Sequence, residues 1–401
     1  MFIKEVMPRI IRNSRGEKTV EITLKTFKGK FTSSAPSGKS KGEHEPAPFN
    51  EMGIQKSLSM TKFFSKKIKN KNFMIKKIDD LKLLTEAIFR FERKHGKLGR
   101  SITYALETVF LKGAAKDLNK ELWQFISEDT NNSKKPKIPM PVGNCMGGGL
   151  HSKLIKGKKP DFQEFLLIPK EKTFSRAVTK NLRAYWYAKK LVRASKRNDE
   201  GAHMTSKTNE EVLEILKAIA KKYKLRIGLD IAASSFYEKG YYKYKNKELL
   251  RDRSDQSDYA ENLIKKYNLF YIEDPMQQED FSGFKEILNT IQKNKTLIVG
   301  DDLTTSNIKF LRRAIHSNSI NAIIIKPNQV NSILDIAKTV KLCKEKNIKI
   351  IFSHRSGETM DNALADYAVG FGADYIKTGI YGRERLIKLK RVIDIEKSLG
   401  G

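Results

Sequence analysis

Six short apolar runs in the second part of the chain each end in a side chain that could do chemistry. Three end in a carboxylate, two in a lysine and one in a histidine, with 23 to 43 residues between consecutive end groups. A single such residue is usually a turn residue or a helix cap. Six in order need another explanation, because buried parallel strands are otherwise nearly continuous Val, Ile and Leu. The end groups are Asp230, Glu273, Asp301, Lys326, His354 and Lys377.

The three acids, Asp230, Glu273 and Asp301, would repel one another strongly if they met without a cation. Carboxylate oxygens suit a hard ion, and a few carboxylates with positions left for substrate oxygens are the usual arrangement for Mg²⁺. Ca²⁺ would also accept these ligands, and any one acid could instead pair with a structural lysine or arginine. The ordered set favours a magnesium site.

The basic end groups indicate proton transfer and phosphate binding. Lys326 follows the third acid, and a partly desolvated lysine near another cation such as Lys377 is expected to have a lowered pKa and to act as a base. The metal would then stabilise the enolate left when that base removes a proton α to a carboxylate. Next to His354, Arg355 and Ser356 add a guanidinium and a hydroxyl, a suitable fork for phosphate.

The elements that must position these groups are repeated βα units. Most of the intervals fit one unit, and intervening stretches such as 332–341 are amphipathic. In a β/α barrel the carboxyl ends of the strands converge on one mouth, where active sites lie. A doubly wound open sheet is the rival fold, but six unbroken units favour closure.

The first part of the chain has a different texture. Alternating apolar residues predict an antiparallel meander from Ile3 to about Ser34, with a turn at residues 28–30. A Gly/Ser/Pro-rich surface loop is expected over residues 33–42, and helices over 50–127. The polar stretch 128–136 is typical of a linker. We therefore predict an N-terminal α+β capping domain over residues 1–130 and a C-terminal β/α barrel over 137–401.

Charge and composition limit the possible partners and the cellular location. The formal net charge of +32 favours non-specific attraction to polyanions, although lysines solvated on outer helix faces are the simpler explanation. Cys145 and Cys343 are too few for a disulfide framework. The sequence has no apolar run long enough to span a bilayer and no signal-peptide pattern at its start. A cytoplasmic location without membrane insertion is expected.

An ordered series of motifs over nearly the whole chain resembles enolase, with a weak likeness to archaeal members. These motifs are Ser34–Glu45, Pro139–His151, Gln163–Phe165, Asp199–Gly201, Gly228–Ser234, Ile272–Pro275, Gly300–Thr304, Ile325–Gln329, Ser353–Thr359 and Ile376–Gly379. The resemblance implies an enolase-type β/α barrel with an N-terminal α+β domain. It also implies a lyase that reversibly dehydrates 2-phosphoglycerate to phosphoenolpyruvate in glycolysis and gluconeogenesis.

The resemblance assigns roles residue by residue. Asp230, Glu273 and Asp301 match the ligands of a first Mg²⁺, and Ser40 matches a serine that helps to bind a second. Lys326 matches the base, a pairing of lysine with Mg²⁺ already known for the enolase superfamily. Glu200 matches the group that assists loss of hydroxide from an aci-carboxylate intermediate. The remaining matches are Glu164 as its neighbouring carboxylate, His151 on a closing loop, Arg355 and Ser356 on phosphate, and His354, Lys377 and Gln163 around the substrate.

Three stretches depart from the family pattern. Residues 13–19 read Asn-Ser-Arg-Gly-Glu-Lys-Thr, where the family usually has Asp first and Asn-Pro after the glycine. This region is tied to subunit contacts in the family, for which a homodimer or higher homo-oligomer is expected. Residues 152–161 form a longer, basic loop, and Ala-His-Met-Thr-Ser follows Gly201. The alternative function is that of an enolase-like protein that binds nucleic acid or surfaces through its charge.

Overall fold

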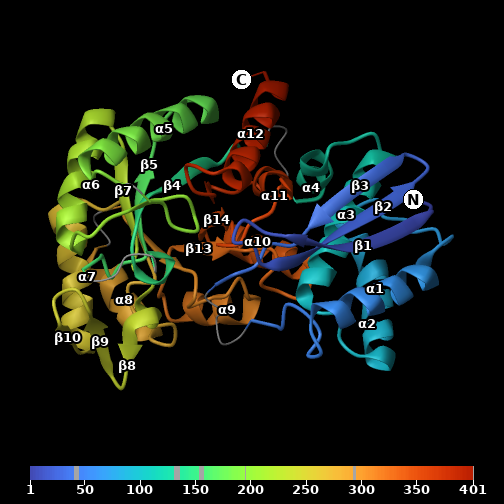
Figure 1. Cartoon of the computed structure of the whole chain (residues 1–401), viewed down its shortest axis with the longest axis horizontal. Coiled ribbons are helices and arrows are strands. Elements are labelled where there is room, and N and C mark those ends of the chain that lie inside the picture. Colours follow the sequence, from blue (N-terminus) through green and yellow to red (C-terminus); the bar gives the residue numbers. More distant parts are fainter. Residues whose placement is uncertain (40–44, 131–135, 153–157, 195, 292–294, 401) are drawn as a thin grey trace.

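The computed structural model describes residues 1–39, 45–130, 136–152, 158–194, 196–291 and 295–400. Figure 1 shows two bodies along the long axis, a small sheet with helices that contains the N-terminus and a larger barrel surrounded by helices. Segments distant in sequence join them: Lys112 of the first body forms an ion pair with Asp361 of the second, with 3.1 Å between nitrogen and oxygen.

The N-terminal body is built on the predicted meander. Strands β1 (Glu5–Arg12), β2 (Lys18–Thr26) and β3 (Gly29–Ser34) pair antiparallel in the order β1-β2-β3. Alternate residues of β2, namely Val20, Ile22 and Leu24, are completely buried. The helices are α1 (Ile54–Ile68), the 3-10 turn η1 (Ile78–Leu81), α2 (Lys82–His95), α3 (Arg100–Asp117) and α4 (Leu122–Thr130). Ser33 and Ser34 belong to β3, so the strand extends into the segment that we expected to be a loop.

Eight strands close the barrel, because the last pairs with the first. This confirms the closed barrel over the open sheet. Around the barrel the strands are β4 (Met140–Gly147), β5 (Glu164–Ile168), β7 (Arg226–Asp230), β11 (Tyr271–Glu273), β12 (Leu297–Gly300), β13 (Ala322–Ile325), β14 (Lys349–Ser353) and β15 (Tyr375–Lys377).

Strand β5 runs antiparallel to both neighbours, β4 and β7. Its first residue, Glu164, therefore pairs with Asp230, the last residue of β7. A carboxylate at the start of this one strand thus reaches the mouth formed by the ends of the others.

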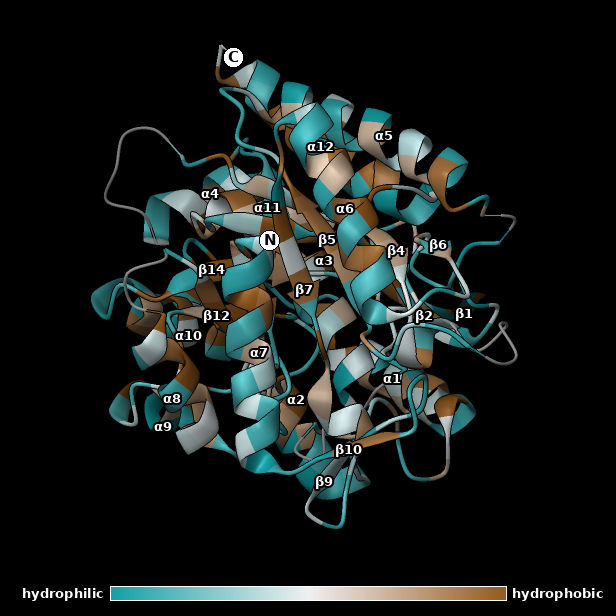
Figure 2. Cartoon of the chain, turned by 90° about the vertical axis from the view of Figure 1, so that its left-hand side faces the viewer, coloured by the Kyte–Doolittle hydropathy of each residue, from teal (hydrophilic) through white to brown (hydrophobic). Residues whose placement is uncertain are grey.

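Helices cover the outside of the barrel, with brown strands inside and teal outer helix faces in Figure 2. They are α5 (Phe174–Leu191), α6 (Asn209–Tyr223), α7 (Arg253–Tyr267), α8 (Phe281–Thr290), α9 (Ile308–His316), α10 (Ile333–Glu345), α11 (Ala363–Gly370) and α12 (Arg383–Ser398). Smaller elements are η2 (Gly149–Ser152), η3 (Ala233–Phe236), β6 (His203–Met204), β8 (Tyr237–Glu238), β9 (Tyr241–Tyr244) and β10 (Leu249–Arg251).

Strand residues alternate between two cores, as the pleat requires. One set packs inside the barrel, including Val299 of β12 and Ile324 of β13. The alternate set, including Ile298 and Ile323, belongs to the core shared with the helices. The barrel is therefore a packed core rather than a pore, and its rim is left for chemistry. Among the described helices, none has the length and apolar character needed to cross a membrane.

Candidate active site

Most of the predicted site residues line one pocket at the mouth of the barrel. Glu273 ends β11, is completely buried, and lies in contact with this pocket's Lys377. Ser40 lies outside the described residues. The lining residues are Gly38, Lys39, His151, Gln163, Glu164, Glu200, Asp230, Asp301, Lys326, Ser353, His354, Arg355, Ser356 and Lys377.

Lys377 lies between the acids of neighbouring strands. Its Nζ donates to Oδ2 of Asp230 at 3.1 Å and to both carboxylate oxygens of Glu273 at 2.9 and 2.8 Å. Oε2 of Glu164 is 3.4 Å away. Burial would lower the pKa of Lys377, but Asp230 and the other two acids hold it well above its usual value. Lys377 is therefore a cation that keeps three buried carboxylates together.

Asp301 and Lys326 form the adjoining pair, with Nζ of Lys326 donating to Oδ2 of Asp301. Burial alone would lower the pKa of Lys326, but Asp301 raises it. The predicted lowered pKa is therefore wrong for the protein without metal, because an acid contacts the lysine directly. The other oxygen of Asp301, Oδ1, is buried and has no hydrogen-bond partner among the described residues.

A second acidic group lies directly behind this pair. Carboxylate oxygens of Asp274, Asp301 and Asp302 all lie within 4.8 Å of one another. Both oxygens of Asp274, however, accept backbone N–H groups, from Asp301 at 3.0 Å and from Asp302 at 2.7 Å. Asp274 thus holds the turn that presents Asp301, and burial beside Asp301 raises the pKa of Asp302 to about 7. Asp301 also influences the predicted set, because it acts with burial and Asp230 to raise the pKa of Glu273.

Glu200 and Glu164 form a buried carboxyl pair on the other side of the pocket. Burial beside Glu200 raises the pKa of Glu164 well above its usual value. Burial also opposes ionisation of Glu200, but His151 and a hydrogen bond with Glu164 lower the pKa of Glu200. A proton held by the pair therefore resides on Glu164, while Glu200 is ionised.

Two histidines, His151 and His354, lie beside the carboxylate of Glu200. Nδ1 of His151 is 2.8 Å from Asp199 Oδ1 and 3.6 Å from Glu200 Oε1, and these acids raise the pKa of His151 against the effect of burial. Nε2 of His354 is 3.9 Å from Glu200 Oε1. Burial and Arg385 lower the pKa of His354. His151 is thus the charged partner of Glu200, and His354 is neutral.

Arg355 and Ser356 follow β14. Nη2 of Arg355 lies 3.1 Å from each carboxylate oxygen of Glu45, and Nη1 donates to Asn328 at 3.1 Å. Burial would raise the pKa of Glu45, but Arg355 and Arg100 lower it to about 2. Gly38 lies against the same guanidinium: a Cβ there would be 1.8 Å from Nη2 of Arg355, so only glycine allows this approach.

Several residues at the site went unnoticed in the sequence. Asn144 donates to Oε2 of Glu200 at 3.2 Å, and Lys39 contacts Asp199 at 3.0 Å. Buried Arg385 of α12 donates to the backbone oxygens of Asp199 at 3.0 Å and Ser356 at 2.8 Å. These residues lie on other elements, so only the fold brings them to the site. Lys39, Asn144 and Asp199 lie inside motifs that resemble the family, but spacing alone could not predict their contacts with Asp199, Glu200 and His151.

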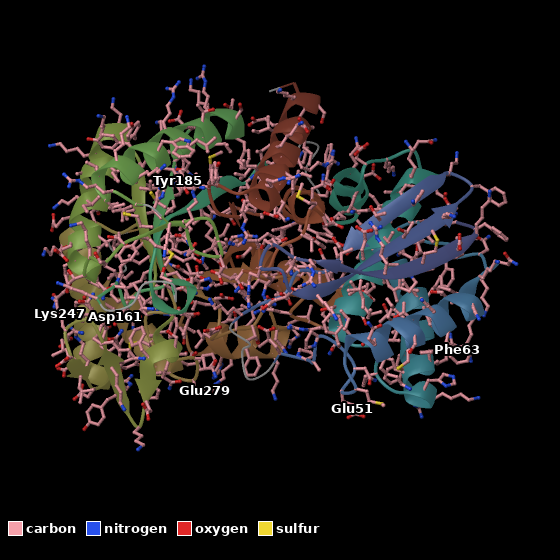
Figure 3. The ribbon with its side chains drawn as sticks, in the orientation of Figure 1. Glu51, Phe63, Asp161, Tyr185, Lys247 and Glu279 are labelled. Atoms are coloured by element: carbon pink, nitrogen blue, oxygen red, sulfur yellow. The ribbon has the colours of Figure 1, made fainter. Side chains whose placement is uncertain are left out.

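The loop that carries Glu200 is held from beneath by an aromatic group. Tyr185 of α5 (Figure 3) donates its hydroxyl to Gly201 O at 2.6 Å and stacks on His203, with 3.9 Å between ring centroids. Arg197 donates to the same hydroxyl at 2.9 Å. His203 lies in the stretch that departs from the family pattern, and it fills a structural position here.

Fold and site together define a class of protein: a closed β/α barrel whose mouth gathers buried carboxylates, lysines and histidines, the groups from which metal-assisted proton-transfer sites are built. The comparisons identify the family. Residues 3–126 match the family profile described as enolase, N-terminal domain, and residues 135–401 match the enolase C-terminal TIM barrel domain.

The similar proteins of known name are called enolase and are mostly archaeal, as the motifs indicated. Those from Picrophilus torridus and Methanothermobacter thermautotrophicus are each 34% identical over 99% of this chain, covering 99% and 97% of their own lengths. A bacterial relative from Ehrlichia chaffeensis is 32% identical over 99% of this chain. The chain belongs to the enolase family, whose activity is that of phosphopyruvate hydratase, a lyase.

Proposed function

We propose that this chain interconverts 2-phosphoglycerate and phosphoenolpyruvate at the barrel mouth, with Lys326 as the base and Glu200 on the leaving-group side. The observation that carries the proposal is the position of the two groups across one pocket. Lys326 follows β13, and Glu164, the partner of Glu200, begins β5. These strands are separated by three strands in either direction around the barrel. A substrate between them would expose C2 to one side and the C3 hydroxyl to the other.

The donor set fits a hard divalent ion. Asp230, Glu273 and Asp301 offer only oxygens, and Oδ1 of Asp301 is buried without a partner in the described part of the chain. Burial and Asp230 raise the pKa of Glu273 to about 8, because neighbouring carboxylates repel one another when too little positive charge lies between them. When bound, Mg²⁺ would offset this repulsion and stabilise the charge that develops on the substrate carboxylate.

Lys326 would take the C2 proton. It must first lose its own proton, which contact with Asp301 now opposes. If Asp301 binds the metal ion, its contact with Lys326 should weaken, because one carboxylate charge cannot be fully directed at both the metal ion and the lysine. Lys377 remains protonated beside Asp230 and Glu273 and adds a fixed positive charge near the substrate carboxylate.

The carboxyl pair would serve the C3 hydroxyl, because hydroxide is a poor leaving group that must be protonated. The proton of the pair resides on Glu164, so it would move from Glu164 to Glu200 or to a water molecule and from there to the C3 hydroxyl, which leaves as water. His151 keeps Glu200 ionised between turnovers. Arg355 and Ser356 would bind the phosphate, and Gln163 and His354 line the same pocket.

We further propose two Mg²⁺ ions per site, with Ser40 at the second, and a domain division at residues 1–130 and 137–401. A cytoplasmic location and a homodimer or larger homo-oligomer are part of the same proposal. Non-specific binding of polyanions would follow from the net charge of +32 and should weaken with salt. The alternative of a binding protein without enzyme activity receives no support from the relatives, which are named enolase.

The test is a spectrophotometric assay that follows the conjugated double bond of phosphoenolpyruvate. Turnover of 2-phosphoglycerate with Mg²⁺ is expected, together with its loss on chelation with EDTA. Lys326→Ala should lower kcat by a factor on the order of 10⁴, the upper range for a general base. Lys349→Ala is the matched control, because Lys349 starts β14 at the far end of the barrel and is 52% exposed. Full activity of Lys326→Ala would refute the assignment.

A further inference from the structure

The turn between β1 and β2, residues 13–17, lies against the loop that follows β14. The backbone N–H of Ser14 donates to Glu358 O at 2.7 Å, and the N–H of Glu358 donates to Oγ of Ser14 at 3.0 Å. Oγ of Ser14 in turn donates to Ser356 O at 3.3 Å. The N-terminal body is therefore bonded directly to the loop that carries the proposed phosphate-binding residues.

Within this contact, the Ser356 hydroxyl receives two hydrogen bonds. Nη1 of Arg15 donates to Oγ of Ser356 at 2.9 Å, and the backbone N–H of Lys39 donates to the same oxygen at 3.0 Å. A serine hydroxyl has two acceptor positions and one hydrogen to donate. With both acceptor positions used, the hydroxyl can only donate. In the described part of the chain no protein acceptor takes that hydrogen, and Ser356 lines the active-site pocket.

Arg15 is itself held in place. Its Nη2 contacts Oε1 of Glu17, and its backbone N–H donates to Oδ1 of Asn13 at 2.9 Å. Oε2 of Glu17 accepts from Asn13 Nδ2 at 3.2 Å and from Ser37 Oγ at 3.0 Å. Asn13 and Glu17 are the positions at which this turn departs from the family pattern, so the carboxylate that steadies Arg15 comes here from Glu17.

We propose that Arg15 is a positioning residue of the phosphate subsite, which fixes the Ser356 hydroxyl as a donor toward the phosphate of the substrate. The inference rests on the proposed function. It gives the N-terminal body a task in binding the phosphate, in addition to the proposed role of Ser40 at the second Mg²⁺. Arg15 acts through Ser356, since its Nη1 points at that hydroxyl and its side chain is only 17% exposed.

The test is a double-mutant cycle between Arg15→Met and Ser356→Ala, with KM for 2-phosphoglycerate, kcat and the Kd of inorganic phosphate measured by calorimetry. Arg15→Met should raise KM and the phosphate Kd about 10-fold and change kcat by less than about 2-fold, as expected for loss of one hydrogen bond to a charged donor. In the Ser356→Ala background the same change should have less than about a 2-fold effect. Arg15→Lys, which keeps one donor, should recover part of the loss.

Arg9→Ala is the matched control, because Arg9 pairs with Glu21 on the same sheet and is 70% exposed. An equal effect of Arg15→Met in both backgrounds, or a fall in kcat with unchanged KM, would overturn the inference. If Arg15→Met unfolds at a lower temperature than the Arg9 control, the comparison is made with Arg15→Lys, and an unchanged phosphate Kd in that variant also overturns it. Failure of the proposed function would instead appear as wild-type protein without turnover, whereas phosphate calorimetry still decides the role of Arg15.

Discussion

The two sides of the active site are built differently. On the metal side, five residues stand at the ends of barrel strands or directly after them and contact one another: Lys377 contacts Asp230 and Glu273, and Lys326 contacts Asp301. On the phosphate side, Arg355 and Ser356 follow a barrel strand and are bonded to Asn328 and Arg385 of the barrel, but they also have partners in the N-terminal body. These partners are Arg15, Lys39, Glu45 and the turn at Ser14.

The difference shows how one site divides its tasks. Side chains on neighbouring strands of a closed barrel keep their spacing, as groups that share a metal and a reacting carbon require. The phosphate side depends on contact between two bodies, so its geometry changes if that contact loosens. We therefore expect changes on the metal side to reduce kcat and changes on the phosphate side to raise KM.

Among the variants that test this comparison, the largest effect is expected for Glu200→Gln, on the barrel side of the site. Loss of this carboxylate removes assistance to the leaving group, and kcat should fall by a factor on the order of 10³, with KM within about 3-fold. Exchange of the C2 hydrogen with deuterated solvent, followed by NMR, should continue because Lys326 is intact. Loss of that exchange together with turnover would mean that the two groups do not act on separate steps.

Arg385 connects the two sides, since it donates to Asp199 O and to Ser356 O. Arg385→Leu should therefore lower kcat and raise KM together, each by about 10-fold, as a charge-assisted link is lost. Arg383→Ala, an exposed arginine on the same helix, is the control and should change neither. An effect on only one of the two constants would show that the sides are independent.

The smallest effect on activity is expected at Glu107, where α3 of the N-terminal body meets the barrel. Its carboxylate accepts from Ser332 Oγ at 2.8 Å and from the N–H of Ile333 at 2.7 Å, just after the Lys326 strand. Burial raises the pKa of Glu107 from 4.5 to about 7. The folded state therefore binds more protons than the unfolded state between these values, and its free energy of unfolding falls as pH rises through this window.

Glu107→Gln removes that titration. Relative to the wild type, the variant should gain stability as pH rises from about 4.5 to 7, by on the order of 3 kcal/mol in denaturant unfolding. Its kcat should stay within about 2-fold. A stability difference that does not change with pH would show that Glu107 remains ionised throughout, held by its hydrogen-bond donors.

The sequence was informative where chemistry coincided with a repeating pattern. The six end groups are the last residues of buried strands or directly follow them, so a barrel and its rim could be predicted from residue type and spacing. The direction of β5 was not predictable in this way, because a single short apolar run such as Glu164–Ile168 reads alike in both directions. Glu164 was therefore found only through the resemblance to the family.

The contacts between the two bodies left no local signal. Arg15 and Ser356 are 341 residues apart, and Glu45 and Arg355 are 310 apart. No periodicity connects such pairs, and a basic chain offers many arginines of similar appearance. The pKa of Lys326 was predicted in the wrong direction for a related reason, because the contact with Asp301 depends on how the two neighbouring strand ends meet. The boundary between the domains at 130 and 137 stays a prediction.

The central claim is that three strand-end acids share one divalent cation, and Mg²⁺ calorimetry without substrate tests it most directly. Wild-type protein should bind Mg²⁺, and Asp230→Asn and Glu273→Gln should each weaken that binding at least about 10-fold, since a buried ligand is lost. Asp394→Asn, an exposed acid on α12, should bind like the wild type. Wild-type affinity in both Asp230→Asn and Glu273→Gln would contradict the account and leave the acids at Asp274, Asp301 and Asp302 as the metal site.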